Sequence, residues 1–230
     1  MSTPETSLEK KSIGQQIRET LIKENPRATA AVWVTLAYLL FQIYRTFVNP
    51  MVPMLVGPHH VSSIGLLCVL LNPGKHKSKA GHIFDVASDW FVFITFFYHV
   101  WYALSQFNRL GIRVNYLDAV YPIDIFECIT LIILIMLGIY RTVGLTLSIF
   151  IGIFIAYAWG AQWLPGILFY DGMTISKFTD LMVMGSEGIY GTATGAGSGF
   201  MYWIMIFGSL FGTCGGGQVL IDIGIKFGTK

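Results

Sequence analysis

Residues 119–162 read AVYPIDIFECITLIILIMLGIYRTVGLTLSIFIGIFIAYAWGAQ, and this stretch decides the class of fold. It is apolar almost throughout and is interrupted mainly by the short segment RTVG, residues 141–144. A helix that crosses the hydrocarbon core of a bilayer needs about 20 predominantly apolar residues. The stretch therefore predicts two consecutive membrane-spanning helices, at 119–140 and 143–162.

The composition of the whole chain agrees with a membrane protein. The 230 residues are 54% hydrophobic and only 12% charged, and the mean hydropathy is +0.61. Soluble domains carry about 25% charged residues. The three cysteines are widely spaced, so they predict neither a disulfide framework nor a metal site. We expect an all-α, polytopic integral membrane protein.

Further apolar segments extend the count to about six transmembrane helices. They lie at 28–48, 58–72, 86–106 and 189–211, and the segment at 58–72 is short and begins with polar residues. The connection at 163–186 contains one more helical pattern, because Ile175, Phe178, Leu181 and Met182 recur on one side. We expect residues 174–184 to form an amphipathic helix on the outer membrane surface.

The placement of basic residues predicts a cytoplasmic N-terminus. Cytoplasmic segments of membrane proteins are enriched in lysine and arginine. Residues 1–27 would form a polar cytoplasmic tail, either solvated or folded as an amphipathic surface helix through Ile13, Ile17 and Leu21. With this orientation the cytoplasmic segments hold Lys10, Lys11, Arg18, Lys23, Arg27, Lys75, Lys77, Lys79, Arg141, Lys226 and Lys230, and the outer segments hold Arg45, Arg109, Arg113 and Lys177.

Several acids interrupt the apolar segments. Asp124 and Glu127 are three residues apart, so they share one helix face near the outer end of their span. Two readings stay open for them: stabilisation of a helix start through its dipole, or a cation path through the membrane. For Asp85 and Asp89 we expect ion pairs with the nearby lysines at 75–79. His99 is expected to be a hydrogen-bonded packing residue.

The segment GSEGIYGTATGAGSGF, residues 185–200, is rich in glycine and contains one acid, Glu187. Glycines four residues apart remove side chains from one stripe of a helix and let a second helix approach closely. Glycine also weakens a helix, so two readings stay open for 195–199: a continuous helix or a broken turn. The candidate packing or ion-path and substrate-path residues are Glu187, Gly188, Gly191, Thr192, Thr194, Gly195, Ser198 and Gly199.

A phosphate-binding loop is a weak interpretation of this segment. No Lys-Ser or Lys-Thr follows the glycines, and no strand precedes them in the predicted pattern. No arrangement of serine, cysteine, histidine and acid indicates nucleophilic catalysis, so we expect no enzyme. We likewise expect no cofactor, no metal site and no nucleic-acid partner.

Residues 139–223 resemble the membrane permeases of tripartite ATP-independent periplasmic (TRAP) transporters, in particular the fused permeases that work with TAXI-type binding proteins. The matching motifs, in order, are RTVG at 141–144, LPG at 164–166, SEGIYG at 186–191, FGSLF at 207–211 and GGGQVLID at 215–222. Residues 28–138 are more loosely similar to the small, four-helix part of these permeases, through the number of spans and Asp89-Trp90. Related permeases carry an acid and a second arginine ahead of RTVG, where this chain has Leu137 and Tyr140.

The resemblance implies a multi-pass protein of the bacterial inner membrane that belongs to a secondary importer. Residues 28–138 would be a membrane scaffold, and 139–230 would be the start of the large transport domain. A periplasmic solute-binding protein would deliver an organic acid, and a sodium or proton gradient would drive uptake. The family's transport part is much longer, so we expect this chain to be incomplete for transport and to pack against the remainder of that domain.

Two other functions fit the same pattern of spans. One is a membrane scaffold or accessory subunit that does not itself transport. The other is a small oligomeric ion channel whose protomers pack through the glycine ladders. The gradient dependence of uptake and the presence of single-channel currents would separate these functions from a permease.

Overall fold

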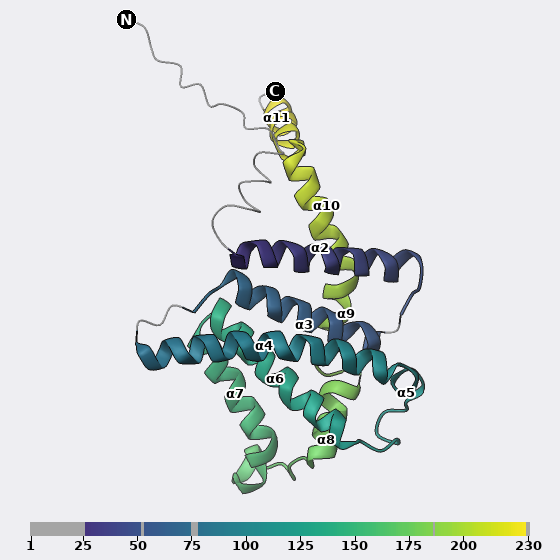
Figure 1. The fold of residues 1–230 in the computed structure, drawn as a ribbon, viewed down its shortest axis with the longest axis vertical. Helices are drawn as coiled ribbons and strands as arrows, with labels where there is room; N and C mark the ends of the chain where they lie inside the picture. Colours follow the sequence, from purple (N-terminus) through teal and green to yellow (C-terminus); the bar gives the residue numbers. More distant parts are fainter. Residues whose placement is uncertain (1–25, 52, 75–77, 186, 229–230) are drawn as a thin grey trace, which may run out of the picture. The chain divides into compact units, whose positions relative to one another are not determined.

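The computed structural model describes residues 26–51, 53–74, 78–185 and 187–228, and these residues form helices and connections without a strand (Figure 1). The predicted all-α fold is therefore confirmed. The α-helices are α2 (Pro26–Phe47), α3 (Pro53–Leu71), α4 (Lys79–Ser105), α5 (Phe107–Ile112), α6 (Pro122–Thr142), α7 (Leu145–Gly160), α8 (Ile175–Thr179), α9 (Thr192–Ala196), α10 (Tyr202–Thr213) and α11 (Gly216–Gly228). Short 3-10 helices cover Ala161–Trp163 and Gly166–Leu168, and π-helical segments cover Asp180–Met184 and Gly197–Met201.

Proline and glycine set several of these boundaries. Proline is the first residue of α2, α3 and α6, a position where its missing N–H and fixed φ cost nothing. Gly144 ends α6 with a φ of +119°, and its N–H donates to the carbonyl of Ile139 at 3.1 Å. This left-handed glycine turn lets α7 begin directly at Leu145.

Among the described residues, four helices are long and apolar enough to cross a membrane: Pro26–Phe47, Lys79–Ser105, Pro122–Thr142 and Leu145–Trp163. They match the predicted spans at 28–48, 86–106, 119–140 and 143–162. The segment at 58–72 lies in α3, whose apolar part, Leu55–Leu71, is shorter than a typical span. The segment at 189–211 belongs to a bent pair, Thr192–Thr213 and Gly216–Gly228, which would make a fifth span if counted as one. The number of about six spans stays a prediction.

The chain divides into two compact units, and neither is continuous in sequence. The described residues of the first unit are 26–50, 62–74, 78–98 and 131–155. The described residues of the second unit are 51, 53–61, 99–130, 156–185 and 187–228. Helices α3, α4, α6 and α7 thus contribute to both units. This division does not follow the predicted boundary after residue 138, which remains untested. Of the predicted tail at 1–27, only Pro26 and Arg27 are described, and both belong to α2.

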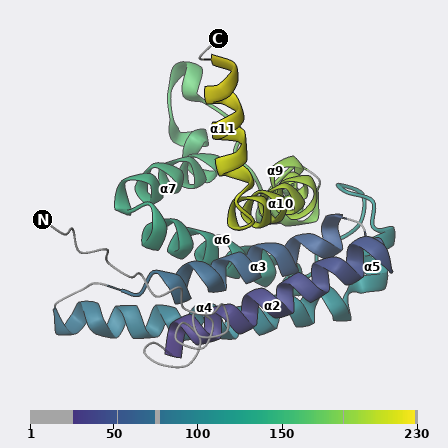
Figure 2. The same ribbon diagram turned by 90° about the horizontal axis from the view of Figure 1, so that it is seen from above.

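In the first unit, α2 runs beside the later part of α3 and the first part of α4 (Figures 1 and 2). Its apolar core includes Leu66, Val69, Val92 and Leu134. Gly65 on α3 is packed so closely against Leu134 on α6 that a methyl group there would overlap the leucine side chain. A small residue at this point allows two helices to come together.

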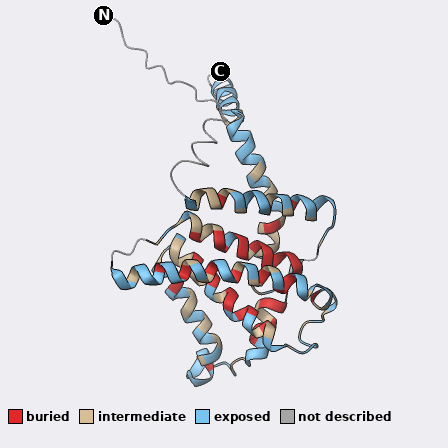
Figure 3. Ribbon diagram, viewed as in Figure 1, coloured by how far each residue is buried: buried red, intermediate tan, exposed pale blue. Residues whose placement is uncertain are grey.

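In the second unit, burial gathers at the start of α3 and around residues 178–190 (Figure 3). Leu55 and Val56 are buried, and the ring of Tyr190 occupies the space beside Gly57. In contrast, most residues of α10 and α11 are exposed. The glycine-rich segment is therefore packed at its start, near Tyr190, whereas the helices that follow it are mostly exposed.

The predicted amphipathic helix at 174–184 is present as helical structure, with Thr174 capping α8 through its hydroxyl and the N–H of Lys177 at 3.3 Å. Its apolar side chains Phe178, Val183 and Met184 are buried within the second unit, and the ring of Phe178 lies 4.6 Å from that of Trp159. Of the predicted apolar side, Phe178 is buried, Leu181 and Met182 are half-buried, and Ile175 is exposed. Its predicted position on the outer membrane surface stays a prediction.

We predict that Gly65→Val destabilises the protein by about 1–3 kcal/mol, because the larger side chain overpacks the α3–α6 contact. Gly138→Ala is the matched control, since a methyl group at Gly138 meets no other atom within 4 Å. That substitution should leave stability unchanged or raise it by up to about 1 kcal/mol. Thermal unfolding of both variants in detergent micelles measures the difference, and equal unfolding temperatures would contradict the packing.

Candidate functional site

Asp124, in the first turn of α6, is fully buried and fully hydrogen-bonded. Its carboxylate accepts from the hydroxyl of Tyr102 at 2.6 Å and from the backbone N–H of Tyr121 at 3.0 Å. The guanidinium of Arg109 donates to both oxygens, with Nη1 2.9 Å from Oδ2 and Nη2 on Oδ1. Asp124 therefore does more than favour a helix start, because it joins α4, α5 and α6 within the second unit.

Glu127 lies one turn further along α6 and is also completely buried. His99 Nδ1 is 2.8 Å from its Oε2, and the hydroxyl of Tyr190 donates to its Oε1 at 3.1 Å. His99 and Tyr102 are three residues apart on α4, as Asp124 and Glu127 are on α6, so matching faces of the two helices meet. We call these side chains the α4–α6 cluster: His99, Tyr102, Arg109, Asp124, Glu127 and Tyr190.

The sequence identified the acids of the α4–α6 cluster but only part of its partners. His99 was expected to be hydrogen-bonded, and it is, whereas Tyr102 fits an interfacial aromatic belt from sequence alone and is in fact buried, with 1% of its surface exposed. Arg109 and Tyr190 carried no local signal, because Arg109 follows the end of α4 and Tyr190 is separated from Glu127 by 63 residues. Only the three-residue spacing of His99 and Tyr102, equal to that of the acids, pointed toward the pairing.

Opposite charges are paired within the α4–α6 cluster. Arg109 balances Asp124, whose carboxylate raises the pKa of Arg109 above its usual value, so the arginine stays charged. Burial raises the pKa of Tyr190 well above its usual value, so its hydroxyl remains a donor. An isolated buried charge is very costly. The pairing with Arg109 therefore stabilises the buried charge of Asp124.

A second ion pair holds the connection after α5 against the helical segment at 175–184. Arg113 Nη1 lies 2.6 Å from Asp180 Oδ1, and both side chains are buried. The other oxygen of Asp180 accepts from the backbone N–H of Tyr116 at 2.8 Å. Tyr116 has a left-handed φ of +64°, a conformation that this hydrogen bond helps to hold.

The first unit contains a separate cluster of two aspartates and two arginines. Arg141 Nη2 lies 3.5 Å from Asp85 and 3.1 Å from Asp89, and it donates to Ser88 Oγ at 2.5 Å. The other carboxylate oxygen of Asp89 is 2.8 Å from Arg27 Nη2. The expected pairing with lysines is not what the described residues show: arginines bind both acids, Lys79 is exposed, and Lys75 and Lys77 lie outside the described residues.

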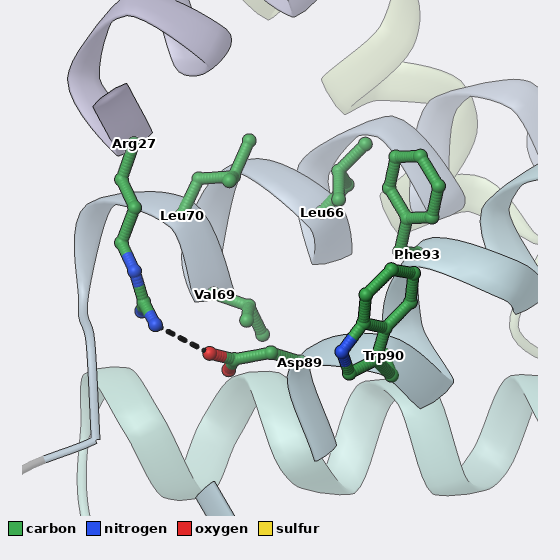
Figure 4. A pocket seen from close by; sticks show the side chains of 7 residues that line it. All are labelled: Arg27, Leu66, Val69, Leu70, Asp89, Trp90 and Phe93. Atoms are coloured by element: carbon green, nitrogen blue, oxygen red, sulfur yellow. Dashed lines mark hydrogen bonds and ion pairs between the residues drawn. The ribbon is translucent and has the colours of Figure 1, made fainter. Parts of the chain in front are cut away.

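A groove of about 240 Å³ opens beside this second cluster (Figure 4). Arg27 and Asp89 form its polar end, and apolar side chains from α3 and α4 form its walls. The wall residues are Leu66, Val69, Leu70, Trp90 and Phe93.

The glycine-rich segment begins with a tight backbone contact. Glu187 is exposed and makes no side-chain hydrogen bond or ion pair with another described residue. Gly188 lies directly against the carbonyls of Leu181 and Met182, and the N–H of Ile189 donates to Met182 at 2.7 Å. Any side chain at 188 would collide with backbone, so this glycine is required for the chain to return to the helical segment at 175–184.

Residues 192–201 are helical rather than fully unwound. Gly191 precedes α9 as its cap and is buried, while Thr192 is exposed. The hydroxyls of Thr194 and Ser198 donate to the carbonyls of Ile189 and Gly195, which lie in the same segment and not on a neighbouring helix. The hydroxyls of Thr194 and Ser198 thus bond to the backbone of their own segment.

A local break does occur in the stretch where the sequence left two readings open. The helix widens to a π-helical turn over Gly197–Met201, and Gly199 inside it has non-helical dihedrals of −101° and −105°. A second break separates α10 from α11 at Gly215, whose φ is +80°, and the two halves are bent by 73°. The structure thus contains both a weakened turn and a sharp bend in this part of the chain.

The glycine ladder has few neighbours among the described residues. A methyl group added to Gly195, Gly199, Gly208 or Gly212 would meet no atom within 4 Å. Gly197 differs, because a methyl group there would lie 3.3 Å from His60 Nε2. The predicted close packing along the ladder is therefore not made by the described part of this chain.

We also searched the described residues for a metal site and compared the chain with known proteins. Within the described ranges, no three His, Cys, Asp or Glu side chains gather as a possible metal site. Comparison with protein-family models, curated proteins and solved structures found no match.

We predict that Arg109→Gln destabilises the protein by up to about 3–5 kcal/mol, because it leaves Asp124 buried without its counter-charge. The double variant Arg109→Gln/Asp124→Asn removes both charges and should recover much of that loss. Thermal unfolding of the two single variants and the double variant forms a complete cycle. Strictly additive effects would contradict the direct pairing.

We also predict that Gly188→Ala is strongly destabilising, whereas Gly195→Ala is neutral or slightly stabilising. The first methyl group collides with the carbonyls of Leu181 and Met182, and the second enters open space in a helix. Thermal unfolding and limited proteolysis of the 180–191 segment compare these two variants. Similar behaviour of both would contradict the close backbone approach at Gly188.

Proposed function

We propose that the chain is a membrane permease component of a TRAP-type secondary transporter of the bacterial inner membrane. In this proposal a periplasmic solute-binding protein delivers an organic acid, such as a dicarboxylate, and a sodium or proton gradient drives its uptake. The N-terminus is cytoplasmic, and residues 139–230 begin the transport domain.

The observation that carries the proposal is the broken helix after residue 191. Transporters build substrate and ion sites from discontinuous helices, because half-helix ends and freed backbone groups can bind ions within the membrane. Here the π-helical turn at Gly197–Met201 and the 73° bend between α10 and α11 fall in the segment that resembles the TRAP permeases. Gly215, where the bend occurs, is the first residue of the GGGQVLID motif.

Four glycines of this region have open space beside them, which supports a partner outside the described residues. Gly195, Gly199, Gly208 and Gly212 present bare backbone with nothing packed against it. Helices with such stripes associate by close van der Waals contact in membranes. The remainder of a transport domain would provide this contact in the proposed permease.

The α4–α6 cluster favours a second candidate, a membrane scaffold that does not transport. Both acids are already saturated by protein donors, and Arg109 balances the charge of Asp124. A buried cluster whose acids are hydrogen-bonded in this way rigidifies the helices that share it. Within the permease proposal the same rigidity suits the predicted scaffold role of residues 28–138, which contain most of this cluster.

Reconstitution distinguishes these functions. Proteoliposomes that contain this chain, the remaining transport domain and the binding protein should take up a labelled organic acid only when a sodium or proton gradient is imposed. Omitting the binding protein should abolish uptake. Gradient-independent uptake, or no uptake of any organic acid tested, would contradict the permease. Single-channel currents from the purified chain alone would support the channel instead.

Glu187 provides a test at the level of one residue. Because its side chain is exposed and unpaired among the described residues, Glu187→Gln should leave the unfolding temperature unchanged. If Glu187 contacts the binding protein, the variant should raise the concentration of binding protein needed for half-maximal uptake by roughly two- to tenfold. Thr192→Ala, at a nearby exposed position, is the control. Unchanged uptake in Glu187→Gln would restrict Glu187 to a role outside docking.

A further inference from the structure

We propose that the groove beside Arg27 and Asp89 binds a phospholipid with a primary-amine head group, of the phosphatidylethanolamine class. The groove belongs entirely to the first unit and is formed by α2, α3 and α4 (Figure 4). This inference does not depend on the proposed transport function. It follows from the order of polar and apolar groups along the groove.

The groove changes from charged to apolar along the helix direction. α3 and α4 run antiparallel in the first unit (Figure 1), so Leu70 to Leu66 on α3 and Asp89 to Phe93 on α4 lead in the same direction. Each step is one helical turn. Figure 4 shows Arg27, Asp89 and Leu70 toward one side and Leu66, Phe93 and Trp90 toward the other. A phospholipid has this same order of head group followed by acyl chain.

The depth of the polar end is compatible with a lipid head group. Arg27 is the second residue of α2, so it lies at the end of a candidate span. Asp89 is further inside α4, but α4 has 27 residues and a length of about 40 Å, which exceeds the hydrocarbon thickness of about 30 Å. Trp90 is 61% exposed beside the acid, and tryptophan is enriched at the level of lipid head groups.

The size of the groove favours one acyl chain over a complete soluble ligand. Its volume of about 240 Å³ lies below the roughly 300–1,000 Å³ of typical small-molecule pockets. Its walls are aliphatic and aromatic side chains of helices that are candidates for membrane insertion. Lipid tails are the apolar ligand present at highest concentration around such helices.

The charges at the polar end match a zwitterion. The side chain of Arg27 is 40% exposed, and its guanidinium can pair with a phosphodiester through two parallel hydrogen bonds. Arg27 now binds Asp89 at 2.8 Å, and a head-group ammonium would take its place on that oxygen. Arg141 remains on the other oxygen at 3.1 Å. Every charge therefore keeps a partner when the lipid is bound.

This exchange predicts a preference among head groups. Phosphatidylcholine has the same net charge, but its quaternary ammonium has no N–H to donate to Asp89. Phosphatidylglycerol has the phosphate but no cation. Its phosphate would draw Arg27 away from Asp89, and no head-group cation would take the place of Arg27 on that carboxylate. Phosphatidylethanolamine is the lipid that satisfies both groups.

Native mass spectrometry of the full chain, titrated with the three lipids at matched acyl chains, tests the proposal. We expect wild-type protein to retain phosphatidylethanolamine roughly three- to tenfold better than the other two. Asp89→Asn should reduce phosphatidylethanolamine to the level of phosphatidylcholine. Arg27→Gln should weaken all three, and Arg45→Gln, which removes the same charge from the other end of α2, should not.

A conservative variant and a soluble ligand provide two further tests of lipid binding in the groove. Arg27→Lys retains the charge beside Asp89 but loses the planar fork, so it should weaken phosphate binding while the protein remains folded by circular dichroism. Equal retention of all lipids by wild-type protein, or unchanged retention in Arg27→Gln and Arg27→Lys, would overturn the proposal. Displacement of the lipid by equimolar glycerophosphoethanolamine, which has no acyl chain, would instead assign the groove to soluble phosphate esters. A dimer that forms through the groove and excludes lipid would also overturn it.

Discussion

The neutralisation of buried carboxylates is the constraint on which the rest of this structure depends. In a bundle of apolar helices, a buried carboxylate without a partner would cost more free energy than most helix contacts provide. Asp124 is therefore surrounded by Arg109, Tyr102 and a backbone N–H, and Asp85 and Asp89 are bound by Arg141 and Arg27. These pairs determine which helix faces meet and in which register.

The irregular backbone follows a related rule. Within a membrane, non-helical backbone is tolerated only where protein or a water-filled cavity covers it. The turn at 185–191 obeys this rule through Gly188 and the buried Tyr190, whose hydroxyl reaches Glu127. Further along, Gly199 and Gly215 bend a helix that has little of the chain around it. That contrast is the main structural support for a missing partner, and it connects the glycine-rich segment with the proposed permease.

The two charged clusters have different exposure, and this suggests different roles. The α4–α6 cluster is closed, since His99, Asp124 and Glu127 are completely buried and both carboxylates are hydrogen-bonded to protein groups. The cluster of the first unit opens through Arg27 and Asp89 onto an apolar groove. A closed cluster stabilises one arrangement of helices, whereas an open one can exchange a protein partner for a ligand of the same charge. The proposed lipid site depends on the exchange of Arg27 for a head-group ammonium on Asp89. The proposed scaffold role depends on the burial of the α4–α6 cluster.

The sequence alone determined the helical class and the four long apolar spans, and it indicated a weakened helix at 195–199 without deciding whether the helix breaks there. These features depend on local composition, on the length needed to cross hydrocarbon and on the low helix propensity of glycine, and all three can be read within one segment. The spacing of Asp124 and Glu127 also placed both acids on one face. Only the tertiary structure decided their partners, because Tyr190 lies 63 residues from Glu127 and Arg141 lies 52 residues from Asp89. Sequence spacing cannot identify such pairs, since the energy of a buried ion pair depends on distance in space and on burial, and both arise only when the helices pack.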